Sequence, residues 1–166
     1  MCIRDRVWMN LVPLPTYVMK EELLKVPFVG PMLKLTGMIS VERAGGAKAM
    51  RGLLKRTEDA AKAGRQMIIF PEGTRLPYGA REPLKPGIVA MARHTGLPVY
   101  PVATNSGLFW PYRGFLKKAG TISIIVCDPV EATGRGEMLS AIEAAWGQAK
   151  ARLDAAPGTG VDNSVG

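Results

Sequence analysis

The segment from Phe70 to Arg75, Phe-Pro-Glu-Gly-Thr-Arg, combines residue types that could bind a phosphate group. Arg75 carries a planar guanidinium that can hydrogen-bond two phosphate oxygens at once, and Thr74 adds a hydroxyl. Gly73 permits a positive φ or a close approach of backbone to ligand, and Glu72 could hold the guanidinium in place. The simpler alternative is a strand-to-loop turn with a solvated ion pair, which stabilises a protein little.

An alternation of strand and helix patterns must position these residues. Apolar or β-branched runs predict strands at residues 16–19, 38–41, 67–70, 99–103 and 121–126. Helical spacing predicts helices at residues 26–37 (begun near Pro31), 45–64, 85–93 and about 137–153. Strands that alternate with helices and are apolar on both faces indicate an α/β fold with a mostly parallel central sheet flanked by helices. Ligands bind such sheets at the carboxyl ends of the strands, where the Phe70–Arg75 segment begins.

Composition limits what the chain can be. It has 166 residues, 22 Lys and Arg against 14 Asp and Glu, and a formal net charge of +8. The hydrophobic fraction of 47% is typical of a globular protein, and two Cys exclude a disulfide framework or a Cys-rich zinc site. No segment reaches the roughly 18 uninterrupted apolar residues of a membrane span. We expect one domain over residues 1–156, followed by a disordered tail at 157–166.

Four stretches in a fixed order resemble the sequence blocks of the glycerolipid acyltransferases. Phe70–Arg75 matches the family's Phe-Pro-Glu-Gly-Thr-Arg block, and Gly37–Arg43 looks like its second block, an apolar strand that ends in Arg. Leu97–Ala103 resembles the fourth block, and Lys20–Leu23 with Val26–Gly30 is similar to the stretch after the first block. Together they cover about residues 16–130. Within the family, the blocks look most like those of bacterial 1-acyl-sn-glycerol-3-phosphate acyltransferases.

The family's first block, His-x-x-x-x-Asp, has no counterpart in this chain. The single His is His94, and the residue five positions further on is Val99 instead of Asp. We expect His94 to be a helix-end or surface residue and not a base. By the family's spacing the dyad would fall before residue 1, so we expect a fragment that lacks the N-terminal part of its domain. No catalytic residue is therefore assigned. A relative that works without this base is the alternative.

The resemblance implies an acyl transfer from acyl-CoA or acyl carrier protein to the free hydroxyl of 1-acyl-glycerol-3-phosphate (lysophosphatidic acid), which gives phosphatidic acid. It implies no metal and no bound cofactor, and the fragment alone should be inactive. The acceptor's phosphate carries nearly two negative charges, so its binding needs several cations or N–H groups. The expected substrate-binding residues are Lys20, Arg43, Glu72, Gly73, Thr74 and Arg75, with Lys85 as a possible contributor.

The acceptor's acyl chain lies in a bilayer, so the resemblance also implies a membrane surface as partner. We expect a peripheral or monotopic protein on the cytoplasmic face. Two apolar segments with neighbouring cations suit the headgroup region: Val26–Leu35 with Lys25 and Lys34, and Leu108–Tyr112 with Arg113, Lys117 and Lys118. The alternative for the second segment is that its aromatic residues pack under a loop.

Other classes of function stay open to different degrees. A non-catalytic module that binds anionic lipid or phosphate would explain both the missing base and the +8 charge. A nucleic-acid binder rests on charge alone, and we expect no nucleic-acid partner because the basic residues are dispersed and no known module is recognisable. A phosphoryl-transfer enzyme is disfavoured because no Gly-rich phosphate loop occurs.

Overall fold

The computed structural model describes residues 15–41, 46–74, 76–110, 117–131 and 134–155. The chain divides into two compact units. Unit 1 comprises Met1–Pro71 and Lys85–Gly96, and unit 2 comprises Glu72–Leu84 and Leu97–Gly166. The one-domain interpretation stays a prediction, and the expected tail at 157–166 lies outside the described residues.

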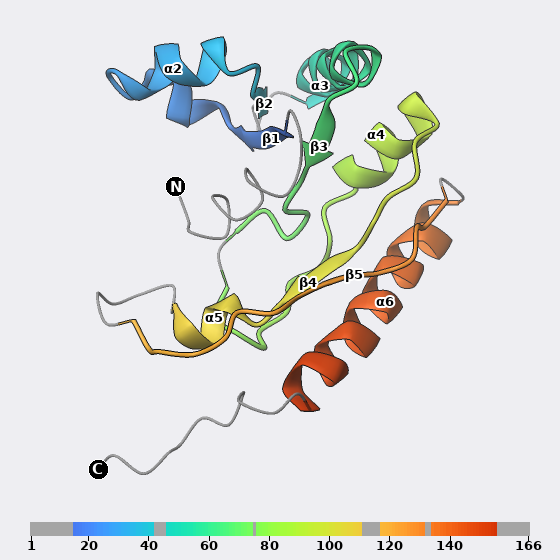
Figure 1. Ribbon diagram of the computed structural model, residues 1–166. Helices are drawn as coiled ribbons and strands as arrows, with labels where there is room; N and C mark the ends of the chain where they lie inside the picture. Colours follow the sequence, from blue (N-terminus) through green and yellow to red (C-terminus); the bar gives the residue numbers. More distant parts are fainter. Residues whose placement is uncertain (1–14, 42–45, 75, 111–116, 132–133, 156–166) are drawn as a thin grey trace. The chain divides into compact units, whose positions relative to one another are not determined.

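Unit 1 is built on a parallel sheet. Its strands are β1 (Pro15–Lys20), β2 (Ile39–Val41) and β3 (Gln66–Ile68), in the order β2-β1-β3 (Figure 1). β1 lies in the middle and runs parallel to both neighbours. The α/β fold with a largely parallel sheet is therefore confirmed, and the strands fall where the apolar runs predicted them.

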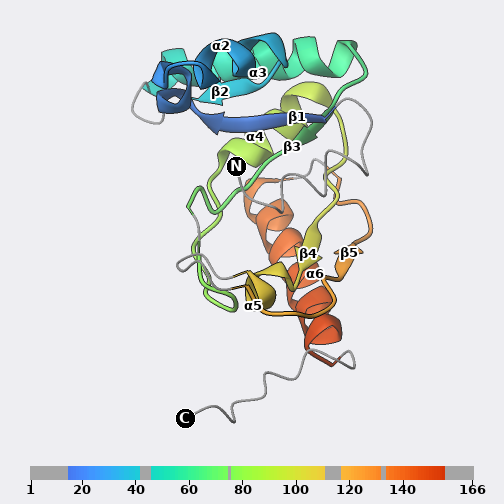
Figure 2. The ribbon, with the colours of Figure 1, turned by 60° about the vertical axis from the view of Figure 1, so that its left-hand side comes forward.

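In the described part of unit 1, four helices accompany the sheet: η1 (Glu21–Lys25), α2 (Val29–Leu35), α3 (Gly46–Lys62) and α4 (Gly87–Thr95). α3 contacts both β2 and β3, and it also packs on α4. Both ribbon views draw α2 and α3 on the same side of the sheet (Figures 1 and 2). The chain leaves α4 at Gly96, whose φ of 68° is the left-handed conformation that commonly ends a helix.

The core of unit 1 joins three of these elements. Ile39 of β2, Leu53 and Ala60 of α3 and Met91 of α4 form one buried cluster. Thr57 is also fully buried on α3, and its hydroxyl donates to the Leu53 carbonyl at 2.8 Å, so the polar atom is satisfied. Burying an apolar side chain as large as those of Ile39, Leu53 and Met91 stabilises a fold by about 1.5–3 kcal/mol each, so these contacts hold α3 and α4 to the sheet.

Unit 2 contains an antiparallel strand pair and a long helix. β4 (Val102–Thr104) pairs with β5 (Ile124–Val126), the short α5 (Ser106–Phe109) follows β4, and α6 (Arg135–Ala155) packs against β4. One face of α6 is buried through Met138, Ile142, Ala149 and Leu153. The sequence predicts one apolar face from the helical spacing of six residues, four of which are these buried ones: Met138, Ile142, Ala145, Trp146, Ala149 and Leu153.

Asn105, which is completely buried, ties the two strands of unit 2 together. Its side-chain oxygen accepts the Ser123 N–H at 2.8 Å, and its side-chain nitrogen donates to the Thr121 carbonyl at 3.2 Å. A buried amide that satisfies both ends in this way fixes the register of the strand that it joins.

Several sequence expectations need correction. The last two predicted strands do not extend a parallel sheet, because β4 and β5 form an antiparallel pair. Val99 lies before β4, where it makes an isolated antiparallel bridge with Val130. α2 begins two residues before Pro31, since proline is tolerated in a first helical turn that needs no N–H donor there. The residues after Lys20, for which no helix or strand was predicted, form a 3₁₀ helix.

A bilayer-crossing helix is not among the described elements, because none is both long and apolar enough.

Candidate functional site

The carboxyl ends of the unit 1 strands share one edge of the sheet. Lys20, the last residue of β1, lies opposite Val41, the last residue of β2. β3 ends at Ile68, opposite Tyr17 of β1, and the chain continues into Phe70 at the same edge. This is the edge at which α/β sheets bind ligands, and it is where the sequence analysis expected the phosphate site.

The structure describes four of the six predicted substrate-binding residues. Lys20 belongs to unit 1 and its side chain is exposed at the end of β1. Glu72, Gly73 and Thr74 belong to unit 2. Arg43 and Arg75 lie outside the described residues. That these six residues converge on one phosphate group therefore stays a prediction.

Phe70 and Pro71 anchor the start of the Phe70–Arg75 block. The Phe70 ring stacks on Tyr17 of β1, with ring centroids 6.5 Å apart and an interplanar angle of 16°. Pro71 is buried, and its carbonyl accepts the N–H of Lys85 at 2.8 Å, just before α4 begins. The block thus leaves the sheet from a fixed point, because both side-chain stacking and a backbone hydrogen bond hold its first residues.

Gly73 makes the turn that follows. Its φ is 71°, in the left-handed region, where glycine alone avoids a steric penalty. Thr74, the next residue, is exposed. The sequence leaves two roles open for this glycine, a positive φ or a close approach of backbone to ligand, and the structure shows the first.

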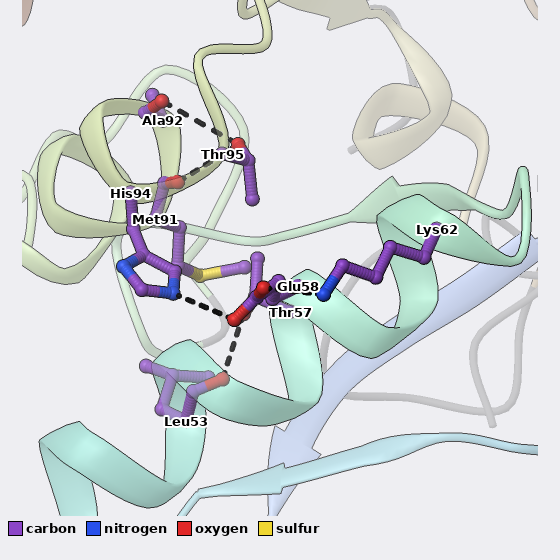
Figure 3. Close-up of polar contacts among 8 residues, drawn as sticks. All are labelled: Leu53, Thr57, Glu58, Lys62, Met91, Ala92, His94 and Thr95. Carbon is purple, nitrogen blue, oxygen red and sulfur yellow. Dashed lines mark hydrogen bonds and ion pairs between the residues drawn. The ribbon is translucent and has the colours of Figure 1, made fainter.

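His94 is part of a polar cluster on the surface of unit 1. It lies in the last turn of α4, and its Nε2 is 3.4 Å from a carboxylate oxygen of Glu58 on α3 (Figure 3). The Lys62 ammonium donates to the other carboxylate oxygen of Glu58 at 2.6 Å. This hydrogen bond is the main reason that the pKa of Glu58 is lowered from its ordinary value. The expectation that His94 is a helix-end, surface residue is confirmed.

Arg65 is a positioning residue that the sequence analysis missed. Its Nε donates to the Thr16 hydroxyl of β1 at 2.5 Å, and a terminal nitrogen donates to the Thr36 carbonyl at 2.6 Å. Arg56 of α3 similarly donates to the Ser40 carbonyl of β2 at 2.8 Å. These arginines therefore hold strands in place. The only signal in the sequence was the position of Arg65 two residues before the strand predicted at 67–70.

A shallow cavity of about 290 Å³ lies beside these arginines, lined in part by Gly37, Ile39, Arg56, Asp59 and Arg65. Ile39 begins β2 and Arg65 directly precedes β3, so the cavity lies toward the amino ends of the parallel strands. It is thus separate from the carboxyl edge, where Lys20 lies.

The second apolar segment proposed for membrane contact is partly covered. An added Cβ at Gly120 would overlap the Phe109 ring, so this ring packs against Gly120. The Lys117 ammonium lies 3.9 Å from the centroid of the Trp110 ring. Both aromatic residues are half-buried, as expected if they pack under a loop. Tyr112 lies outside the described residues.

The fold and the sequence together define the class of protein. The family model described as acyltransferase matches residues 5–105, and the chain belongs to this family. It is 40% identical over 119 residues to a 1-acyl-sn-glycerol-3-phosphate acyltransferase of Pseudomonas aeruginosa, which covers 72% of this chain and 46% of that protein. A coconut (Cocos nucifera) protein of the same name is 28% identical over 125 residues, with 74% of this chain and 41% of that protein covered.

A solved structure shares the fold. The crystal structure of the 1-acyl-sn-glycerophosphate (LPA) acyltransferase PlsC from Thermotoga maritima matches with a TM-score of 0.71 at 23% identity. The match covers 92% of this chain and 62% of that one. The chain spans about half the length of the curated relatives it matches.

Proposed function

We propose that this protein transfers a fatty acyl group from a thioester, acyl-CoA or acyl carrier protein, to the free hydroxyl of 1-acyl-glycerol-3-phosphate, giving phosphatidic acid. One observation carries the proposal: the acyltransferase block Phe70–Arg75 leaves the carboxyl edge of a parallel sheet, the edge that Lys20 also occupies. Membership of the acyltransferase family and the named reaction of its bacterial relative support it.

Phosphate recognition is the role proposed for the residues of this chain. Arg75, Arg43 and Lys20 would neutralise the dianionic phosphate, and the backbone and hydroxyl of Gly73 and Thr74 would add hydrogen bonds. Glu72 would orient the Arg75 guanidinium. Holding the phosphate fixes the glycerol hydroxyl at the thioester, which lowers the entropic part of the barrier.

In the proposed reaction the hydroxyl oxygen attacks the thioester carbonyl carbon directly. The C–S bond breaks, the thiol leaves, and a general base takes the hydroxyl proton. The thioester drives the transfer, so we propose no metal and no bound cofactor. The family's His-Asp dyad would supply the base, and this chain has only His94, which pairs with Glu58. We therefore propose that the 166-residue chain alone is inactive.

The acceptor and product are lipids, so the protein would work as a peripheral or monotopic protein at the cytoplasmic face of a membrane, where thioester donors are available. We propose no nucleic-acid partner. The alternative, a non-catalytic module for anionic lipid or phosphate, is favoured by the missing dyad and by the net charge of +8.

The test is an Arg75→Ala substitution in this chain joined to an upstream segment that supplies the family's His-x-x-x-x-Asp block. Loss of a bidentate, charge-assisted contact should raise the KM for lysophosphatidic acid by about 10- to 100-fold. Arg81→Ala is the matched control, because Arg81 is an exposed arginine of unit 2 outside the block. An unchanged acceptor KM in Arg75→Ala would refute the phosphate role. Thioester turnover by the unextended chain would refute the inactivity.

A further inference from the structure

Five large apolar side chains of η1, α2 and the turn between them are exposed on unit 1, and we call them the α2 patch. They are Leu23, Val26, Phe28, Met32 and Leu35. Met32 and Leu35 belong to α2 and are three residues apart, so they lie on one face of the helix, and Phe28 directly precedes the helix. Phe28 is 89% exposed and Leu35 is 88% exposed. Large apolar side chains that are exposed together in this way mark an interaction surface.

The backbone at Phe28 strengthens this inference. Its φ is 65°, and it is the only non-glycine with a positive φ in the part of the chain that the structure describes. This conformation is unfavourable for a bulky L-residue. The turn is nevertheless firmly built, because Gly30 is buried, its N–H donates to the Val26 carbonyl at 2.9 Å, and an added Cβ would overlap the Leu24 carbonyl. Strain of this kind is typical of functional surfaces, and here it presents an aromatic ring to solvent.

The charge of the chain is concentrated in the unit that carries the patch. Unit 1 contains 14 Lys and Arg against 6 Asp and Glu, which gives +8, whereas unit 2 contains 8 of each and is neutral. Lys20 precedes η1, Lys25 is its last residue, and both are exposed, although Glu21 and Glu22 offset them locally. α3 lies on the same side of the sheet as α2 and adds exposed Lys48, Arg51 and Lys55 (Figures 1 and 2).

We propose that the α2 patch is a membrane-contact surface that inserts into the headgroup region of a bilayer containing anionic lipids. Apolar and aromatic side chains then leave water, while the cations of unit 1 face lipid phosphates. A second copy of the chain fits less well, because patch-to-patch contact would bring two units of +8 together. We also infer that this bilayer holds the acceptor lipid, and only this last statement rests on the proposed function.

The central test is co-sedimentation of the 166-residue chain with phosphatidylcholine vesicles, with and without phosphatidylglycerol. Phe28→Gly removes the ring and also relieves the positive φ, so it should bind about tenfold less while its Tm stays equal or rises. Phe28→Gly with Leu35→Ser should bind about 100-fold less. Tyr100→Ser is the matched control, since Tyr100 is an exposed aromatic residue of unit 2 and its loss should leave binding unchanged.

The charge part of the proposal has its own arm. Lys25→Gln should weaken binding about fivefold on vesicles with phosphatidylglycerol and leave binding to pure phosphatidylcholine unchanged. Raising salt from about 0.1 M to about 1 M, which shortens the screening length from about 10 Å to about 3 Å, should weaken the anionic component in the same way.

Wild-type binding by a folded Phe28→Gly variant overturns the proposal. So does a concentration-dependent dimer that Phe28→Gly dissociates, because a second copy would then cover the patch. The assay contains neither thioester nor lysolipid. Failure to bind vesicles therefore counts against the patch alone, whereas an unchanged acceptor KM in Arg75→Ala counts against the proposed reaction alone.

Discussion

Unit 1 and unit 2 place their charges differently. Unit 1 carries the whole net charge of +8, and two of its arginines, Arg56 and Arg65, donate to strand residues. Unit 2 is neutral, and a buried amide, Asn105, joins its strands. The comparison teaches that cations dispersed along a sequence can still give a net positive charge to one folded unit and none to the other. Unit 1, which contains the parallel sheet and the exposed apolar side chains of α2, is also the unit that would attract an anionic partner.

The largest expected effect comes from a matched pair of Gly→Ala substitutions, one in each unit. Gly30→Ala should lower the free energy of unfolding by at least about 2 kcal/mol, because its Cβ would overlap a backbone carbonyl that cannot move aside. Gly147→Ala lies within α6, where the new methyl group meets only an arginine nitrogen at 4.0 Å, and it should stabilise by about 0.5–1 kcal/mol. Urea unfolding measures both.

Equal effects of the two alanines on the free energy of unfolding would show that the η1–α2 turn is not tightly packed. Gly30 in unit 1 and Gly147 in unit 2 would then not differ. Hydrogen exchange sharpens the result, because Gly30→Ala should loosen amides of unit 1 before those of α6.

The next effect concerns the arginine that positions strands. Arg65→Ala removes hydrogen bonds to Thr16 and Thr36, and should cost about 1–3 kcal/mol in thermal or urea unfolding. Arg81→Ala in unit 2, an exposed position, should stay within about 0.5 kcal/mol of wild type. If Arg65→Ala behaved like Arg81→Ala, Arg65 would not stabilise the fold, and its charge would be available to a partner.

The smallest effect is a pH dependence confined to unit 2. Burial, together with a 2.6 Å hydrogen bond to Asp154, raises the pKa of Tyr78 to about 12 from an ordinary 10.0. Folding thus favours the neutral phenol. Its contribution is complete below pH 10 and is lost as pH rises from 10 to about 12. The stability difference between wild type and Tyr78→Phe should therefore shrink across this window, as followed by urea unfolding. A difference that stays constant from pH 10 to 12 would contradict the burial of the phenol.

Local patterns predicted much of the fold. The apolar runs located β1, β2 and β3, and helical spacing located α3 and α6 with the buried face of α6. Gly73 was expected to allow a positive φ and does so. These features depend on residues close in sequence, so a reader of the chain alone can find them.

Long-range features could not be predicted in the same way. The antiparallel pairing of β4 and β5 depends on Asn105 meeting Ser123, eighteen residues away, and no local pattern announces that contact. The hydrogen bond from Arg65 to Thr16 spans 49 residues. The segment Val26–Leu35 looked suited to a membrane from its sequence, but a buried helix would have the same apolar content. Its exposure had to be observed.

The order of the blocks in the sequence determined the family, because residue types at fixed spacing can be recognised in the sequence without knowing which residues are in contact. The sequence also determined the total charge. Only the tertiary structure decided that three strands end at one sheet edge, that the +8 gathers in unit 1, and that Phe28 stands in water on a strained backbone. The physical reason is that burial and pairing arise between residues distant in the chain, so they exist only once it has folded.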